Sequence, residues 1–135
     1  MNLTLLDTNI CVYVIKARPA EVLARFNDFE AGELAVSVIT ALELTVGARR
    51  ASHTAYARRV EALLTQLEVL PLMAEVADAY ATTRLDLQAR GELIGPMDLL
   101  IAAHALSLNA TLVTNNEREF RRVAGLRVEN WAQRR

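Results

Sequence analysis

Three short apolar runs divide this chain, and each is followed by polar residues. Residues 3–6, 34–39 and 111–114 contain no charged side chain, which is typical of strands in the middle of a parallel sheet. Weaker runs at 69–70 and 126–128 predict a short strand or extended link and an edge strand, respectively. The sequence therefore predicts buried strands separated by long connections.

Between these runs, apolar residues recur at every third or fourth position, which predicts helices. The predicted helices follow Asp7 or Thr8, begin at Pro19 and at Thr40, span Tyr56–Leu67 and residues 73–90, and run from Pro96 to Asn109. Strands that alternate with helices predict an α/β fold. We expect one domain over residues 1–135, with a mostly parallel central sheet of about four to five strands and helices on both faces.

Acidic and amide side chains stand near the ends of the predicted strands. Asp7 directly follows the first run, Glu43 follows the second, and Asn116 follows the third. Asp98 opens the helix that leads into the third run. Ligands of open α/β sheets bind at the carboxyl ends of the strands, and acids gathered there repel one another unless a cation compensates them. Oxygen ligands of this kind favour Mg²⁺ or Mn²⁺.

Each acid also has an explanation that needs no metal. Thr40 and Glu43 have the spacing of a capping box, in which a threonine and a glutamate satisfy the first backbone N–H groups of a helix. Asp98 lies in a first helical turn, where the helix dipole favours negative charge. Asp7 can itself be an N-cap. Helix capping explains each acid when it is considered alone. The expected position of all the acids at one edge of the sheet favours a shared cation.

Composition narrows the function classes without choosing among them. The chain has 135 residues and a net charge of −1, which argues against a protein held to nucleic acid by an overall positive field. A nuclease remains compatible, because an acidic metal site offsets basic residues in the sum. Cys11 is the only cysteine, so no intrachain disulfide is expected. With no leader and no run near the roughly 18 apolar residues of a spanning helix, we expect a cytoplasmic protein without a membrane partner.

Several cationic side chains leave two interpretations open. Arg84 shares a helical stripe with Leu87, and it is either a phosphate clamp near the acids or a stem that covers apolar surface. His104 lacks metal-ligand spacing and is expected to pack or to meet solvent. A second basic group either grips RNA or is simply solvated; it consists of Arg49, Arg50, Arg58 and Arg59.

Four blocks of the chain, in order, resemble the PIN-domain ribonucleases, and specifically the VapC-type toxins of bacterial toxin–antitoxin pairs. The matching blocks are Leu5–Cys11, Ser37–Leu44, Ile94–Ala105 and Leu112–Phe120, and the likeness closes with Val128–Trp131. The resemblance covers essentially the whole chain. It implies a PIN-like fold.

The resemblance also implies a site. The family cuts RNA with magnesium or manganese held by acids at the strand edge, and its first three acids match Asp7, Glu43 and Asp98. Its fourth position, an aspartate in many members, matches Asn116 here. An asparagine offers a carbonyl oxygen but no charge, which weakens the case for a second metal. Glu119, in the next turn, is a candidate for the missing charge.

The expected reaction is hydrolysis by a metal-activated water, without a covalent enzyme intermediate. Asp7 and Asp98 hold the metal, while Glu43 orients or deprotonates the water or acts as a further ligand. Thr8 and Thr114 are expected to hydrogen-bond the carboxylates. The opening of the chain resembles toxins that cleave the anticodon loop of initiator tRNA, so RNA, and tRNA in particular, is the expected substrate. The resemblance also implies a VapB-type antitoxin and a homodimer.

Two alternatives of other classes remain. One is a catalytically inactive PIN-fold binding module. The other is an unrelated metal-dependent α/β phosphatase or receiver-like domain, since these folds also place acids at strand ends. Such domains usually need a second acid close to the first, or a later lysine. Asp7-Thr8-Asn9 lacks that acid, and Lys16 is the only lysine.

Overall fold

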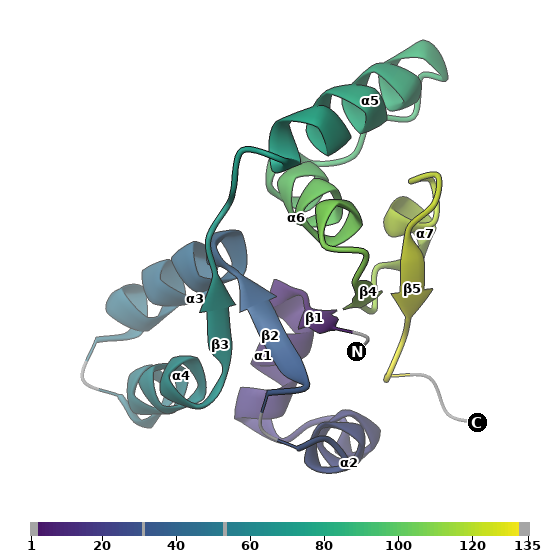
Figure 1. Cartoon of the computed structure of the whole chain (residues 1–135). Coiled ribbons are helices and arrows are strands. Elements are labelled where there is room, and N and C mark those ends of the chain that lie inside the picture. The colour runs from purple at the N-terminus through teal and green to yellow at the C-terminus, as the bar shows by residue number, and fades with distance from the viewer. Residues whose placement is uncertain (1–2, 31, 53, 133–135) are drawn as a thin grey trace.

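The computed structural model describes residues 3–30, 32–52 and 54–132. Its strands form one five-stranded sheet in the order β3-β2-β1-β4-β5, and every neighbouring pair is parallel (Figure 1). The strands are β1 (Thr4–Leu6), β2 (Leu34–Ser37), β3 (Glu68–Leu70), β4 (Thr111–Val113) and β5 (Arg127–Glu129). The helices are α1 (Thr8–Lys16), α2 (Ala20–Asn27), α3 (Val38–Ala51), α4 (Ala55–Gln66), α5 (Val76–Ala89), α6 (Pro96–Ser107) and α7 (Glu117–Phe120).

The sheet is covered on both faces, as the sequence predicts. Neighbouring residues of a strand point to opposite faces, so Leu6 and Val36 join one core while Leu5 and Ala35 join the other. The first core contains buried residues of α1, α2 and α4, and the second contains buried residues of α5, α6 and α7. Because both faces are buried, the central strands read as uninterrupted apolar runs.

The second apolar run contains a strand and the start of a helix. A strand over residues 34–39 is wrong at its end, because β2 stops at Ser37 and α3 begins at Val38. The Ser37 hydroxyl accepts a hydrogen bond from the Ile39 N–H at 3.1 Å and so caps α3. Thr40 is therefore a buried residue inside the helix and not its N-cap, and the capping box with Glu43 does not form.

The edges of the sheet agree with the weaker runs. The run at 69–70 belongs to β3, and the run at 126–128 overlaps β5, so both form edge strands. Helix starts differ by a few residues from expectation: Pro19 is the N-cap of α2 and not its first residue, and α5 begins at Val76. No helix in the described ranges is long and apolar enough to cross a membrane.

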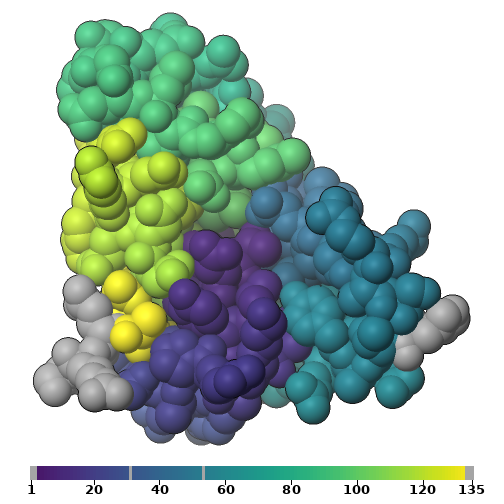
Figure 2. All heavy atoms as spheres, turned by 180° about the vertical axis from the view of Figure 1, so that it is seen from behind, coloured from purple at the N-terminus to yellow at the C-terminus, as the bar shows by residue number. Residues whose placement is uncertain are grey.

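The opening segment of the chain occupies the middle of the molecule. Figure 2 shows it between the surface formed by residues of α3 and α4 and the surface formed by the C-terminal half. β1 is likewise the central strand of the sheet. The residue that follows β1 therefore stands at the centre of the strand-end edge.

Candidate functional site

The three central strands end side by side and bring distant parts of the chain together. β1 pairs with β2 on one side and with β4 on the other. The backbone N–H of Asp7, just after β1, donates to the carbonyl oxygen of Val113 at 3.0 Å. Glu43 lies in the second turn of α3, which follows β2 directly. Residues 114–116 follow β4.

Asp7 is a buried carboxylate, with 4% of its surface exposed. It is the N-cap of α1, and its Oδ1 accepts a hydrogen bond from the Ile10 N–H at 2.9 Å. Burial raises the pKa of Asp7 to about 6, although hydrogen bonds from Thr114 and Ile10 oppose this rise. The charges of Asp98 and Glu43 raise the pKa further. Capping and membership of an acidic cluster thus coexist at this residue.

Glu43 is held by the first residue of α1. The Thr8 hydroxyl donates a hydrogen bond to Glu43 Oε1 at 2.6 Å, and its Oγ1 lies 3.4 Å from that of Thr40. These contacts fasten the start of α1 to α3. The prediction that Thr8 and Thr114 hydrogen-bond carboxylates is confirmed. Thr8 bonds Glu43, and Thr114 bonds Asp7.

Asp98 reaches the same edge from α6. It lies in the first turn of that helix, which begins at Pro96, and its side chain is half-buried. Burial is the main cause that raises the pKa of Asp98 to about 6, and the charges of Glu119 and Glu43 add to it. Asp7, Glu43 and Asp98 therefore share one electrostatic neighbourhood.

Asn116 and Glu119 form a pair beside this group. The Asn116 side-chain amide donates to Glu119 Oε2 at 3.2 Å, and the Asn116 backbone N–H donates to the Thr114 hydroxyl at 2.9 Å. Since the nitrogen of the side-chain amide is engaged, the Asn116 carbonyl oxygen is the atom left for a cation. Glu119 brings a negative charge that Asp98 feels.

The donor set fits a hydrated hard cation better than a fully enclosed one. In the described part of the chain, no three His, Cys, Asp or Glu side chains converge closely enough to hold an ion. Mg²⁺ requires only one or two direct carboxylates and keeps several waters. Among the described residues, Asp7, Glu43 and Asp98 form no ion pair with any arginine or lysine. These carboxylates repel one another, and a divalent ion is the compensation that their chemistry suits.

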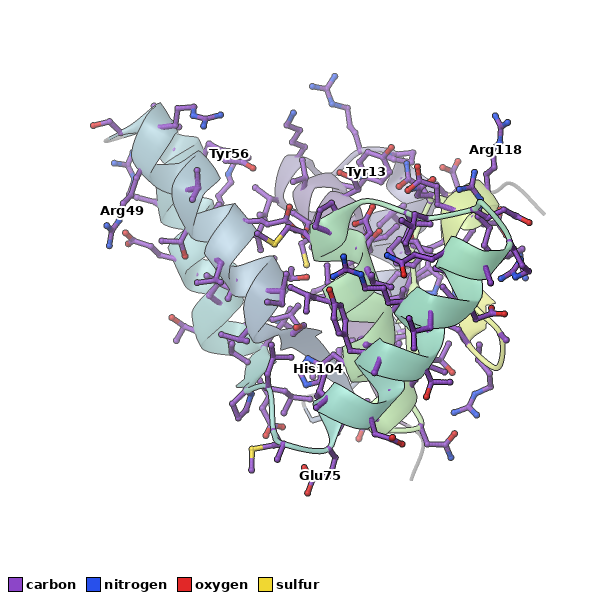
Figure 3. All side chains as sticks on the ribbon, turned by 90° about the horizontal axis from the view of Figure 1, so that it is seen from above. Tyr13, Arg49, Tyr56, Glu75, His104 and Arg118 are labelled. Atoms are coloured by element: carbon purple, nitrogen blue, oxygen red, sulfur yellow. The ribbon has the colours of Figure 1, made fainter. Side chains whose placement is uncertain are left out.

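A buried polar network that the sequence did not reveal joins α6 to α3. His104 is 1% exposed, and its Nδ1 lies 2.8 Å from the Ser37 hydroxyl oxygen (Figure 3). The ring also hydrogen-bonds the backbone of Pro71. Burial lowers the pKa of His104, and the Pro71 bond opposes this effect. His104 therefore packs, and it links the helix that carries Asp98 to the cap of the helix that carries Glu43.

Asn115 is a second residue near the edge that sequence reasoning missed. Its side-chain amide donates to the Tyr13 hydroxyl at 2.7 Å. Its buried Oδ1 has no hydrogen-bond partner among the residues that the structure describes. The paired asparagines after β4 are a visible signal in the sequence, but only the fold shows that one of them faces α1.

Arg84 lies beside the segment that carries Asp98. Its guanidinium donates to the Tyr80 hydroxyl at 3.0 Å, with Cζ 6.0 Å from the centre of the Tyr80 ring. Both side chains line a small cavity with Leu93, Ile94, Pro96 and Leu99. The other basic group is exposed near the end of α3 and along the first half of α4. Figure 3 shows Arg49 of this group far across the molecule from Arg118, a residue of α7, which is the helix that contains Glu119.

Comparison with known proteins gives a consistent result. Residues 4–126 match the PIN domain family. Ribonuclease VapC2 of Haemophilus influenzae is 45% identical over 131 residues, which cover 94% of this chain and 96% of that protein. The tRNA(fMet)-specific endonuclease VapC of Shigella flexneri is 40% identical over 129 residues, which cover 95% and 97%.

Solved structures agree with these relatives. The chain superposes on a chain of VapBC2 from Rickettsia felis, solved bound to a DNA fragment from the promoter, with a TM-score of 0.87 and 36% identity. That match covers 96% of this chain and 98% of the other. On the fold, the order of its motifs and these relatives, the chain belongs to the PIN-domain family and, within it, to the VapC ribonucleases.

Proposed function

We propose that this chain is a Mg²⁺- or Mn²⁺-dependent endoribonuclease that acts as the toxin of a toxin–antitoxin pair. The observation that carries the proposal is that Asp7, Glu43 and Asp98 influence one another electrostatically at the central strand ends. None of the three forms an ion pair with a described arginine or lysine. Phosphodiester hydrolysis is a reaction that such an edge suits, because a cation there faces both the acids and an incoming phosphate.

The residues take separate roles in this reaction. Asp7 and Asp98 would hold the ion, and Glu43 would orient or deprotonate the attacking water. Thr8 keeps Glu43 in place through its 2.6 Å hydrogen bond, and Thr114 does the same for Asp7. When bound, the ion would supply positive charge, which lowers the pKa of a water and neutralises charge that develops on the phosphate.

Asn116 and Glu119 contribute at the border of this site. The Asn116 carbonyl oxygen serves as a neutral ligand or contacts a coordinated water. Glu119 brings negative charge close to Asp98, and it is fixed by the Asn116 amide. Because Glu119 is the only charged group of this pair, we propose one hydrated ion and not two.

The proposed substrate is tRNA, with the anticodon loop of initiator tRNA as the first candidate. A relative that is 40% identical is named a tRNA(fMet)-specific endonuclease, which supports this choice. The proposed partner is a VapB-type antitoxin, because the similar solved structures are VapBC assemblies. We propose that the toxin works as a homodimer in the cytoplasm.

The test is cleavage of defined RNAs by the purified chain. Initiator tRNA and elongator methionine tRNA are incubated with Mg²⁺, with Mn²⁺ and with EDTA, and the fragments are mapped. We expect cuts in the initiator anticodon loop with either metal and none with EDTA. An Asp98→Asn variant, which keeps the shape of the side chain, should be inactive. Equal cleavage by this variant, or in EDTA, would contradict the proposal.

A catalytically inactive binding module is the second candidate. Asn116 favours an inactive module, because this position holds a neutral amide and a fourth acid here would strengthen metal binding. This candidate predicts that tRNA binds and stays intact with both metals, and that an Asp7→Ala variant represses growth as strongly as the parent. A phosphatase or receiver-like role lacks the second acid beside Asp7 that it usually needs.

A further inference from the structure

Arg84 and Tyr80 form a small cavity next to the acidic edge that the reaction outlined above does not use. The cavity has a volume of about 120 Å³ and an apolar floor. We propose that it is a subsite for the nucleotide beside the scissile phosphate, with Arg84 binding that nucleotide's phosphate and Tyr80 contacting its base or ribose. This inference rests on the proposed ribonuclease function and names how the substrate is held.

The cavity and Asp98 share one segment of chain. Ile94 and Pro96 line the cavity and flank Gly95. Asp98 Oδ2 lies 3.9 Å from the position that a Cβ atom on Gly95 would occupy. Leu99, the residue after Asp98, is another lining residue. In the proposed arrangement, an RNA strand whose phosphate reaches Asp98 places its next nucleotide at this cavity, because the cavity and Asp98 belong to the same segment of chain.

The charge of Arg84 fits an anionic ligand. Its side chain is exposed, it is oriented by the Tyr80 hydroxyl at 3.0 Å, and it forms no ion pair with an acid in the described part of the chain. Arg90, on the same face of the sheet, is instead tied to Asp86 at 2.9 Å and to Glu92 at 3.2 Å. A guanidinium that is positioned but not neutralised is well suited to a phosphate.

The acidic edge needs such a contact. Asp7, Glu43, Asp98 and Glu119 lie close together, and the chain carries a net charge of −1, so the site repels a polyanion until a cation compensates the acids. A fixed arginine beside the edge offsets this repulsion locally. The Tyr80 ring and the apolar floor add a contact that tolerates any base, since every base offers a flat face.

The experiment tests whether Arg84 contacts one particular phosphate of the substrate. A short RNA that contains the cleaved loop is made with one neutral methylphosphonate at each position in turn. kcat and KM are measured for the parent, Arg84→Gln, Arg84→Ala, Tyr80→Leu and the matched control Arg90→Ala. Thermal unfolding of each variant shows that it is folded.

We expect KM to rise about tenfold in Arg84→Gln and in Arg84→Ala, with kcat nearly unchanged. The slope of the logarithm of RNA affinity against the logarithm of salt concentration should fall by about one. In the parent, one methylphosphonate next to the cut should raise KM by the same factor. In both Arg84 variants, that same substitution should change nothing further. Tyr80→Leu should raise KM to a smaller extent, and Arg90→Ala should match the parent.

Two results would overturn the subsite. One is an Arg84 variant that behaves like Arg90→Ala. The other is a methylphosphonate effect that is identical in the parent and in the Arg84 variants at every position. If the parent binds RNA without cutting it, the proposed function fails, and the same scan is read as binding affinity. Coupling between Arg84 and one phosphate then still supports the subsite, and its absence refutes it.

Discussion

Acids at the central strand ends differ from acids elsewhere on the surface in whether an arginine neutralises them. Glu117 pairs with Arg121 at 2.7 Å, and Glu129 pairs with Arg25 at 3.0 Å. At the strand ends, Asp7 and Glu43 instead accept hydrogen bonds from hydroxyl and backbone N–H groups. No ion pair neutralises Asp7, Glu43 or Asp98 within the described residues.

The pKa values record this difference. Hydrogen bonds from Arg121 and Asn130 hold the pKa of Glu117 below its usual value. Burial and neighbouring acids raise the pKa values of Asp7 and Asp98 to about 6 each. Glu117 thus contributes slightly to folding as a charged group, whereas Asp7 and Asp98 oppose folding when they are charged. The fold therefore tolerates unfavourable repulsion and desolvation at the strand ends, which a bound cation would relieve.

The largest expected effect comes from removing charge at the centre of the edge. Asp7→Asn keeps the shape of the side chain and its capping ability, because asparagine is a good N-cap. We expect RNA cleavage to fall by more than about 100-fold, since even groups that only orient metal ligands are worth about 10- to 100-fold. The matched control is Glu117→Gln on the paired surface, which should cleave at the parent's rate.

The stability of the metal-free protein should fall as pH rises from about 4 to about 6. The pKa values of Asp7 and Asp98 are near 6 in the folded state and 3.8 in the reference state, so the folded state keeps its protons longer. Their contribution is present in full below pH 4 and is lost as pH rises through 6. The Asp7 shift alone sets an upper limit of about 3 kcal/mol.

Urea unfolding in EDTA across this pH range measures the effect. An Asp7→Asn, Asp98→Asn double variant should lose much less free energy of unfolding between pH 4 and pH 7 than the parent. At pH 7.5, Mg²⁺ should stabilise the parent much more than the double variant, because the double variant lacks the two carboxylates that are proposed to hold the ion. Parallel pH curves for the two proteins would show that the strand-end acids are not destabilising.

A smaller effect is expected where a hydroxyl holds a carboxylate. Thr8→Val removes the 2.6 Å hydrogen bond to Glu43 and leaves every charge in place. We expect cleavage to fall by about 10-fold, with a smaller change in metal affinity than Asp7→Asn causes. Thr65→Val is the control, since the Thr65 hydroxyl bonds the backbone of Glu61 on the exposed face of α4. A Thr8→Val protein as active as this control would remove Thr8 from the site.

The smallest effect belongs to the paired surface. Arg121→Ala breaks the exposed pair with Glu117 and should lower the free energy of unfolding by less than about 1 kcal/mol. RNA cleavage should stay at the parent's level. A loss of cleavage comparable to that of Thr8→Val would mean that the two regions are not functionally distinct.

Much of the fold was predictable because burial imposes a simple pattern. The strands around Leu5 and Leu112 are covered on both faces, so they appear in the sequence as uncharged runs. The parallel arrangement then puts Asp7, Glu43 and Asn116 near one edge. The start of α3 was not predictable, because Val38 and Ile39 are β-branched residues that look like strand while Ser37 already caps the helix.

The finer parts of the site depend on tertiary contacts that carry no local signal. Nothing in the sequence pairs Ser37 with His104, which lie 67 residues apart, or Asn115 with Tyr13, which lie 102 residues apart. Arg84 could be placed on a helical stripe, but its position beside the segment that carries Asp98 follows only from the packing of α5 against α6. The sequence predicts which acids lie near the strand ends, and the fold is needed to show which side chains hydrogen-bond them.

The central claim is that the unpaired strand-end acids form a divalent cation site that drives RNA cleavage. Its most direct test is a Mn²⁺ titration at pH 7.5, followed by electron paramagnetic resonance, of the parent, Asp7→Asn and Asp98→Asn. The account predicts saturable binding by the parent, loss of that binding in each variant, and cleavage that rises with occupancy. Binding that is equal in all three proteins, or cleavage that persists without the ion, would contradict it.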